Sequence, residues 1–240
     1  MITELRRLWQ QAFGDSDAFL DGFFAAGYDP DRCRYLASDG RVLAALYWFD
    51  CFAEGKKYAY LYAIATDENC RNQGLCHRLM AETHQYLRDC GYAGALLVPG
   101  SGSLFRFYEK LGYTTSSYVE EFAATAGAPI SLRSVDTAEY AALRQQLLPA
   151  GGLVQEGATL TFLARFARFY AGSGFVFAAT AEDGCAYVHE LLGSADATAI
   201  VAALGCREGR IRTPGNGKPF AMFYPLDGSV APKYLGLALD

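Results

Sequence analysis

The sequence predicts an α/β (α+β) protein in which helices flank a mixed sheet in a first domain and a smaller α+β domain follows. Residues 57–98 have the pattern of strand, glycine-ended loop, helix and strand, which is a βαβ unit that joins parallel strands. Residues 123–129 (AATAGAP) are small and end in proline, which favours a linker. We therefore expect domains at 1–124 and 129–240.

The composition is that of a globular chain and excludes several classes of protein. Of the 240 residues, 52% are hydrophobic and 20% are charged, which excludes a disordered chain. The net charge is −5 and neither half is basic, so we expect no nucleic-acid partner. No stretch approaches the ~18 apolar residues of a membrane-spanning helix, so we expect no membrane partner. The amphipathic start lacks the pattern of a signal peptide, and we expect a cytoplasmic protein.

Cysteine and histidine positions do not indicate a metal site. The seven cysteines form an odd set without a C-x-x-C pair, so we expect free thiols. Two of the three histidines, His77 and His84, fall on one predicted helix with no carboxylate companion on the same face. We expect no metal ligands in this chain.

Hydrophobic periodicity and turn residues place the elements of the first half. Helical spacing of apolar residues predicts helices at 3–13 and 17–26. The Asp39-Gly40 dipeptide tolerates the positive φ of a tight turn and predicts a hairpin between strands at 34–38 and 42–50. The remaining expected elements are strands at 57–66, 93–98 and 113–122 and helices at 75–90 and 103–111.

The second half is expected to contain helices followed by strands. We expect helices at 136–148, 158–171 and 195–204 and strands at 174–180, 184–191, 210–213, 219–224 and 233–239. Residues 213–218 form a turn cluster, and the spacing of a phosphate-binding P-loop is absent there. Most aromatic residues of this half should build its core.

The strand-to-helix connection at residues 67–77 has the features of an anion-binding loop. The first amides of a helix lack intrahelical partners and lie at the positive end of its dipole, so they can hold a pyrophosphate. Gly74 allows close approach of the backbone, and Arg71 adds a permanent charge. The residues that would form this loop are Arg71, Asn72, Gln73, Gly74, Leu75, Cys76 and His77. Alternatively, Gly74 only breaks an ordinary connection.

A second motif lies downstream and makes a family resemblance specific. Residues 71–76 (RNQGLC) and 107–113 (FYEKLGY) stand in the order and surroundings of two motifs of the GNAT superfamily of acyl-CoA N-acyltransferases. The family patterns are R/Q-x-x-G-x-G/A, which binds the pyrophosphate of acetyl-CoA, and F-Y-x-K-x-G-F/Y. The resemblance covers residues 1–122. It departs at Cys76, where the family usually has glycine or alanine; cysteine is small enough to leave the backbone accessible.

The resemblance implies a fold and a place for the substrate. It implies a mostly antiparallel sheet with a central, splayed parallel pair of strands. The main chain of Ile64, Ala65 and Thr66 would pair with the pantetheine arm, and a backbone N–H near residues 64–65 would stabilise the oxyanion. Ser101 and Ser103 would bond the pantetheine, although capping of the helix at 103–111 is the alternative. Acetyl-CoA would be the co-substrate.

Tyr108 matches the family tyrosine that gives a proton to the departing CoA thiolate; the alternative is a core tyrosine. The general base is open. The predicted strand before the loop offers no carboxylate before Asp67. The other candidates are Glu120, its neighbour Glu121 and the chain-terminal carboxylate of Asp240. Asp240 is included because some GNAT relatives with an added C-terminal domain use the terminal carboxylate as the base.

The resemblance therefore implies an N-acetyltransferase that transfers an acetyl group from acetyl-CoA to the primary amine of a small molecule by direct attack. Two alternatives are a non-catalytic acyl-CoA-binding or regulatory module and a protein or peptide N-acetyltransferase. The second domain is expected on the acceptor side, as a degenerate second GNAT copy or a small lid, and a second pair of motifs is absent. We expect one CoA site per chain and leave a homodimer open.

Overall fold

The computed structural model describes residues 1–239, which form two compact units. Unit 1 contains residues 1–114 and 222–231, and unit 2 contains residues 115–221 with the segment that begins at Pro232. Unit 1 thus includes a segment from near the end of the sequence. The expected domains, 1–124 and 129–240, are continuous segments, whereas each compact unit is made of two segments. The domain limits remain a prediction.

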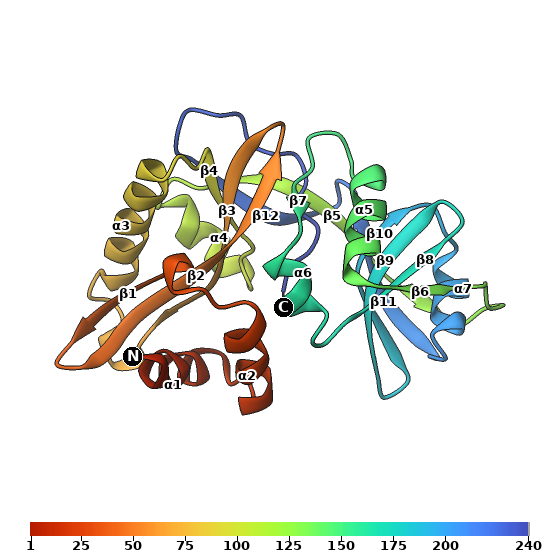
Figure 1. The fold of residues 1–240 in the computed structure, drawn as a ribbon, viewed down its shortest axis with the longest axis horizontal. Helices are drawn as coiled ribbons and strands as arrows, with labels where there is room; N and C mark the ends of the chain where they lie inside the picture. Colours follow the sequence, from red (N-terminus) through yellow and green to blue (C-terminus); the bar gives the residue numbers. More distant parts are fainter. Residues whose placement is uncertain (240) are drawn as a thin grey trace. The chain divides into compact units, whose positions relative to one another are not determined.

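Unit 1 is a mixed sheet with helices on both faces (Figure 1). The strands lie in the order β1-β2-β3-β4-β12, and β3 with β4 is the parallel pair. The other pairings in this unit are antiparallel. The elements are α1 (Ile2–Phe13), α2 (Asp17–Ala26), β1 (Cys33–Ser38), β2 (Arg41–Ala53), β3 (Lys56–Thr66), α3 (Leu75–Asp89), β4 (Gly94–Leu97), α4 (Gly102–Glu109) and the end of β12 (Lys218–Pro225). Two 3₁₀ turns, Pro30–Arg32 and Glu68–Cys70, join them.

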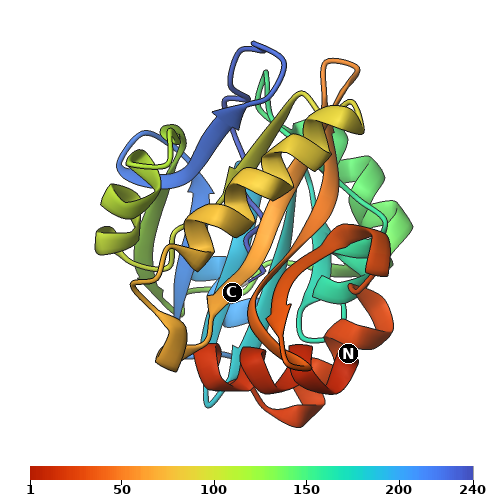
Figure 2. The same cartoon turned by 90° about the vertical axis from the view of Figure 1, so that its left-hand side faces the viewer.

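The alternation of side chains along β2 distributes the core over two faces. Trp48 faces α3, and both are part of one buried cluster. Tyr47 faces the other way, where its ring lies 5.3 Å from Trp9 of α1 and 5.0 Å from Phe23 of α2. Figure 2 shows α3, in yellow, lying in front of the strands of unit 1. Because both faces of the sheet are covered, its central strands are almost entirely apolar.

The parallel pair separates toward its carboxyl end. β3 pairs with β4 only from Tyr58 to Tyr60, while β3 continues beside β2 as far as Thr66. A bulge interrupts the β2–β3 register, and Ala63 within it has φ 48°. A bulge bends and twists the strand that carries the extra residue. The expected mostly antiparallel sheet with a splayed parallel pair is therefore confirmed.

The strands of unit 2 lie in the order β5-β11-β10-β9-β8-β6. Here β10 and β11 form the parallel pair, and the other pairings are antiparallel. The elements are β5 (Thr114–Thr125), β6 (Arg133–Val135), α5 (Thr137–Leu147), β7 (Val154–Gln155), α6 (Ala158–Leu163), β8 (Arg168–Gly172), β9 (Phe175–Glu182), β10 (Cys185–Gly193), α7 (Ala197–Ala203) and β11 (Glu208–Pro214).

The two units repeat one topology. The order of elements from α1 to β4 recurs from α5 to β11. Each copy has two helices, then three antiparallel strands, then a helix, and then a fourth strand that is parallel to the third strand. The fourth strand of each copy then receives an antiparallel neighbour, β12 beside β4 and β5 beside β11. Since β5 follows the first copy and β12 the second, each copy gives its next strand to the other unit. The second half is thus a copy of the fold rather than a lid.

The structure corrects three expected elements of the second half. The helix expected at 158–171 ends at Leu163, and Arg168–Gly172 is strand β8, in which Phe169 and Ala171 are buried at alternate positions. Residues 123–125, expected in a linker, are the end of β5 and pair with β11. The strand expected at 233–239 is absent from the described chain. The segment is buried except at Lys233. The main chain of Lys233 and Tyr234 bonds to the main chain of residues 151 and 153, and that of Leu235 and Leu237 bonds to the side chains of Ser117 and Gln155.

Candidate functional site

The two loops that carry the predicted site residues of unit 1 leave the same edge of the sheet. β3 and β4 are parallel, so their carboxyl ends lie at one edge. The chain from β3 to α3 and the chain from β4 to α4 both begin there. The anion-binding loop and Ser101 are therefore at one edge, although they are separated by α3 and β4 in the sequence.

The loop before α3 is open and turns sharply. Asn72 has φ 61° and Gly74 has φ 77°, the left-handed conformation that glycine and asparagine adopt most readily. Gly74 is the N-cap residue, and no side chain caps the helix. A Cβ added at Gly74 would meet no atom within 4 Å. Nothing described therefore covers the backbone at this turn.

The first turn of α3 presents free main-chain donors. The first intrahelical bond of the turn runs from the amide of Arg78 to the carbonyl of Gly74, at 3.0 Å. The amides of residues 75–77 precede it and have no carbonyl partner within the helix. Arg71 and His77 are exposed beside them, whereas the charge of Arg78 is offset by Glu82 at 2.7 Å. This arrangement suits an anionic group.

Asp67, at the start of the loop, is fully buried and ionised. Its carboxylate accepts hydrogen bonds from the guanidinium groups of Arg41 (2.8 Å) and Arg7 (3.1 Å) and from the amide of Asn69 (3.1 Å). Burial alone would raise the pKa of Asp67, but the Arg41 and Asn69 bonds lower it to about 2. A carboxylate held in this way is a poor general base.

Tyr108 lies in the last turn of α4 with its ring in the core of unit 1. Its side chain is 7% exposed and packs against Tyr113, with ring centroids 5.8 Å apart. Burial raises the pKa of Tyr108, and the nearby Cys76 thiol raises it further. A phenol of ordinary pKa is already protonated at neutral pH, and the raised pKa keeps Tyr108 so. Burial also raises the pKa of Cys76 to about 11, which disfavours a reactive thiolate.

The two serines before and within α4 do not cap it. Ser101 is the N-cap residue but makes no capping hydrogen bond. Its hydroxyl oxygen lies 3.0 Å from that of Ser103, and both residues are exposed. The capping role considered for Ser101 and Ser103 is thus not observed, and both hydroxyls remain accessible to a ligand.

The main chain expected to meet the pantetheine arm lies at the splay. Ala65 and Thr66 pair with Ala45 and Ala44 of β2, and Ile64 lies in the bulge. On the opposite edge of β3, pairing with β4 has already ended at Tyr60. The structure therefore leaves that edge of residues 64–66 without a strand partner among residues 1–239.

Of the candidate bases, Glu120 and Glu121 belong to unit 2. The carboxylate of Glu120 accepts a bond from the amide of Asn216 at 3.3 Å. Glu121 pairs with Arg212 and Lys218, and these bonds lower its pKa although burial opposes them. Asp240 lies outside the described residues. No signal local to the sequence indicates the Arg7–Asp67–Arg41 cluster, because its members are far apart in the chain.

Unit 2 has no equivalent of the open loop. Only Ser194, Ala195 and Asp196 stand between β10 and α7, and the carboxylate of Asp196 accepts bonds from the amide (2.9 Å) and hydroxyl (2.8 Å) of Thr198. The amide that an anion would use is therefore occupied by a negatively charged side chain. α7 is also short, with seven residues.

No group of three or more histidine, cysteine, aspartate or glutamate side chains within residues 1–239 is placed to hold a metal ion. None of the helices in that range is long and apolar enough to cross a membrane.

Comparison with known proteins shows which folds this chain resembles. Residues 1–116 match the model of the acetyltransferase (GNAT) domain. A GCN5-related N-acetyltransferase from Kribbella flavida is 19% identical, with a TM-score of 0.72 over 95% of this chain and 70% of that one. The corresponding enzyme from Anabaena variabilis is 15% identical, with a TM-score of 0.71 over 94% and 70%. No curated protein matches in sequence.

A tandem GNAT protein from the clavulanic acid biosynthesis pathway is 13% identical, with a TM-score of 0.59 over 95% of this chain and 96% of that one. Such low identities establish a shared fold alone. The similarity to a tandem GNAT protein agrees with the repeated topology of units 1 and 2.

Proposed function

We propose that the chain transfers an acetyl group from acetyl-CoA to the primary amine of a small molecule in a ternary complex, because residues 1–116 match the GNAT acetyltransferase domain. The observation that carries the proposal is the open turn at Gly74. It combines an uncapped helix start, a left-handed backbone and empty space where a Cβ would stand. Those are the features a diphosphate requires of a main-chain binding site.

The residues of unit 1 suggest how such a substrate would lie. The amides of Leu75, Cys76 and His77 and the loop residues Arg71, Asn72, Gln73 and Gly74 would hold the diphosphate. The pantetheine arm would follow the free edge of Ile64, Ala65 and Thr66 and reach the hydroxyls of Ser101 and Ser103. This path uses the separation of β3 from β4, which frees main-chain groups that a longer parallel pair would occupy.

The proposed chemistry is direct attack by a neutral amine. The amine nitrogen forms a bond to the thioester carbonyl carbon, and an amide N–H near residues 64–65 stabilises the oxyanion. The carbon–sulfur bond then breaks, and the CoA thiolate takes the proton of Tyr108. The proton released by the amine passes to a base, for which Glu120 and the carboxylate of Asp240 are the candidates, and returns through solvent to Tyr108.

We propose a small molecule as the acceptor because the second unit adds a large body to a chain whose net charge of −5 would repel acidic proteins. Peptides as acceptors and association into a homodimer are alternatives that peptide assays and light scattering would test.

Calorimetry with CoA and a thiol-release assay with a panel of primary amines and peptides together test the proposal. Binding of CoA with turnover on a small amine supports it. Binding without turnover on any acceptor would instead identify an acyl-CoA-binding module, and turnover on peptides alone would identify a peptide acetyltransferase. Absence of CoA binding would refute the site itself.

A further inference from the structure

We propose that Asp67 is a positioning residue that fixes the anion-binding loop to α1 and β2 and thereby sets the affinity for acyl-CoA. The inference rests on the proposed function, because it assumes that the loop holds the diphosphate. Asp67 would not touch the substrate. It would act through the backbone that follows it.

The contacts of Asp67 use both carboxylate oxygens. Oδ2 accepts from Nη2 (2.8 Å) and Nε (3.1 Å) of Arg41 and from Nη1 (3.1 Å) of Arg7. Oδ1 accepts from the amide (3.1 Å) and Nδ2 (3.4 Å) of Asn69 and from Nε2 of Gln11 (3.5 Å). The side chain is 0% exposed, so solvent cannot replace any of these donors.

These partners come from three elements. Arg7 and Gln11 are one turn apart on α1, and Arg7 also donates to the carbonyl of Val42 at 2.7 Å and to Glu4 at 3.0 Å. Arg41 begins β2. Asn69 belongs to the 3₁₀ turn that leads directly to Arg71. The carboxylate is thus the point at which a rigid helix and a rigid strand hold the first half of the loop.

The second half of the loop is anchored separately by α3. Leu75 and Cys76 pack against the core cluster, whereas residues 71–74 between the two anchors are exposed. Asn72 and Gly74 hold left-handed conformations in that exposed stretch. Losing the first anchor would therefore let the amides of the turn move while leaving the helix in place.

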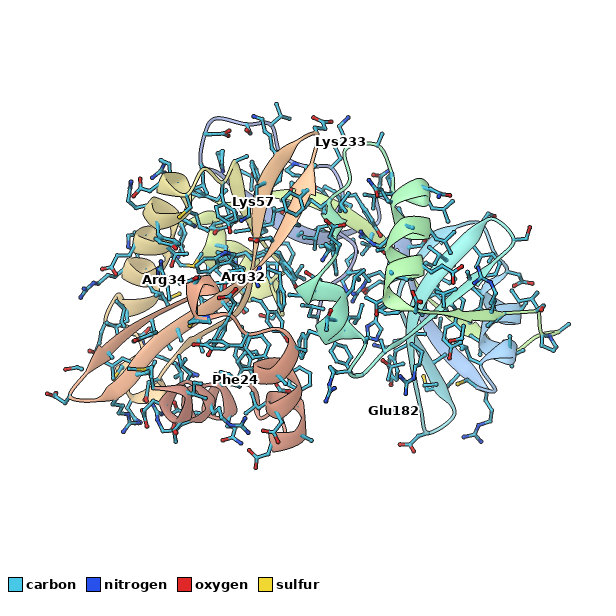
Figure 3. The ribbon with its side chains drawn as sticks, in the orientation of Figure 1. Phe24, Arg32, Arg34, Lys57, Glu182 and Lys233 are labelled. Atoms are coloured by element: carbon cyan, nitrogen blue, oxygen red, sulfur yellow. The ribbon has the colours of Figure 1, made fainter. Side chains whose placement is uncertain are left out.

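A second charged carboxylate in unit 1 provides a matched control. Asp50 of β2 pairs with Lys57 (3.0 Å) and Arg32 (3.3 Å), both labelled in Figure 3, and accepts a bond from Tyr92. Asp50 pairs across the sheet with Ala59 of β3, whereas Asp67 follows the end of β3 at Thr66. The two carboxylates are therefore about 25 Å apart along that strand. Removing the charge of Asp50 should disturb unit 1 without disturbing the loop.

Electrostatics and positioning predict opposite signs for Asp67→Asn. CoA is an anion, so removing a negative charge beside the loop would by attraction alone strengthen its binding. Loss of the anchor would weaken its binding, because the amides would have to be ordered by the ligand. The direction of the change therefore separates the two roles.

The experiment compares Asp67→Asn with Asp50→Asn by CoA calorimetry, by acetyl-transfer kinetics and by hydrogen exchange of the amides at 68–74. For Asp67→Asn we expect the Kd for CoA and the KM for acetyl-CoA to rise about tenfold, with kcat at saturation unchanged and faster exchange in the loop. For Asp50→Asn we expect the Kd and the exchange to match the wild type.

Arg41→Lys covers the case in which Asp67→Asn does not fold. It keeps the positive charge of this half-exposed residue but removes the pair of hydrogen bonds that the guanidinium donates to Asp67. A positioning role for Asp67 therefore predicts weaker CoA binding and faster exchange, whereas a purely electrostatic role predicts no change. Tighter binding by Asp67→Asn, or equal effects of Asp67→Asn and Asp50→Asn, would overturn the inference. If the wild type does not bind CoA, the proposed function fails; exchange at 68–74 then reports separately whether Asp67 holds the loop.

Discussion

Nε2 of His84 lies 2.7 Å from the hydroxyl oxygen of Tyr113, and both side chains are buried in unit 1. The imidazole also stacks on Tyr224 of β12, with ring centroids 4.1 Å apart and planes 13° apart. One residue of α3 thus joins the last tyrosine of the second motif to the strand contributed by the far end of the chain. Burial, aided by Arg88, lowers the pKa of His84 to about 4.

The lowered pKa predicts that acid destabilises the protein through His84. Between pH 6.5 and about 4 the unfolded chain binds a proton at this residue and the folded chain does not, so stability falls as the pH falls. The loss should approach about 1.4 kcal/mol per pH unit, or about 3 kcal/mol in total. Urea unfolding at several pH values should show this slope, and His84→Gln should reduce it. His77→Gln, at an exposed position on the same helix, should retain it.

Local periodicity predicted the first half of the fold well. The βαβ unit and the hairpin at Asp39-Gly40 depend on short-range patterns, and both glycine and aspartate there have positive φ as expected. By contrast, β8 was hidden in a run of aromatics that fits a helix as well as a strand. The strand exchange could not be predicted, because the pairing of β5 with β11 joins residues more than eighty positions apart.

The same distinction holds for the candidate site. The open turn lies within a few consecutive residues, so its glycine and its helix start were visible in the sequence. The anchor of that turn was not, because Asp67 lies 60 positions from Arg7 and 26 from Arg41. The prediction of a strand at 233–239 was wrong for a related reason. Ser117 and Gln155 bond both main-chain groups of Leu235 and Leu237, so side chains take the place of a strand.

Tyr108→Phe should lower turnover more than it weakens CoA binding. The phenol is protonated at neutral pH and can give a proton, and its ring is already packed, so removing the hydroxyl leaves the core filled. We expect kcat to fall about a hundredfold and the Kd for CoA to stay within about twofold. Tyr35→Phe, at an exposed tyrosine of unit 1, is the control and should leave both unchanged. Equal losses in kcat and affinity would argue against proton donation.

Gly74→Ala should separate backbone strain from loss of the site when it is compared with Gly91→Ala. The two glycines stand at opposite ends of α3 with φ 77° and 76°, and a Cβ at either would meet no atom within 4 Å. Both variants should lose about 1 kcal/mol of stability, because alanine disfavours that conformation. Only Gly74→Ala should weaken CoA binding. If calorimetry shows the same Kd for both, the turn at Gly74 does not hold the diphosphate.

The chain should bind one CoA, although it contains two copies of the fold. In the second copy, Asp196 both blocks the amide of Thr198 and places a negative charge where a diphosphate would bring its own. Calorimetry should therefore give a stoichiometry of one, and Asp196→Asn should leave the Kd unchanged because the short connection from β10 supplies no open turn. A stoichiometry of two would show that unit 2 binds the ligand in another way.

Unit 2 should depend on the ion pair between Arg144 and Glu190. Nε of Arg144 lies 2.6 Å from Glu190, the two side chains are 2% and 0% exposed, and Tyr234 donates to the same carboxylate at 3.0 Å. Glu190→Gln would leave a buried guanidinium without its counter-charge, which costs about 3–5 kcal/mol. Glu82→Gln breaks the exposed pair with Arg78 and should cost less than about 0.5 kcal/mol. Tyr234, which directly follows the segment of unit 1 at 222–231, is bonded to Glu190. Glu190→Gln should therefore also loosen the chain around Tyr234, which limited proteolysis would detect as faster cleavage there. A loss no larger than that of Glu82→Gln would mean that the packing around Arg144 holds this segment without the charge.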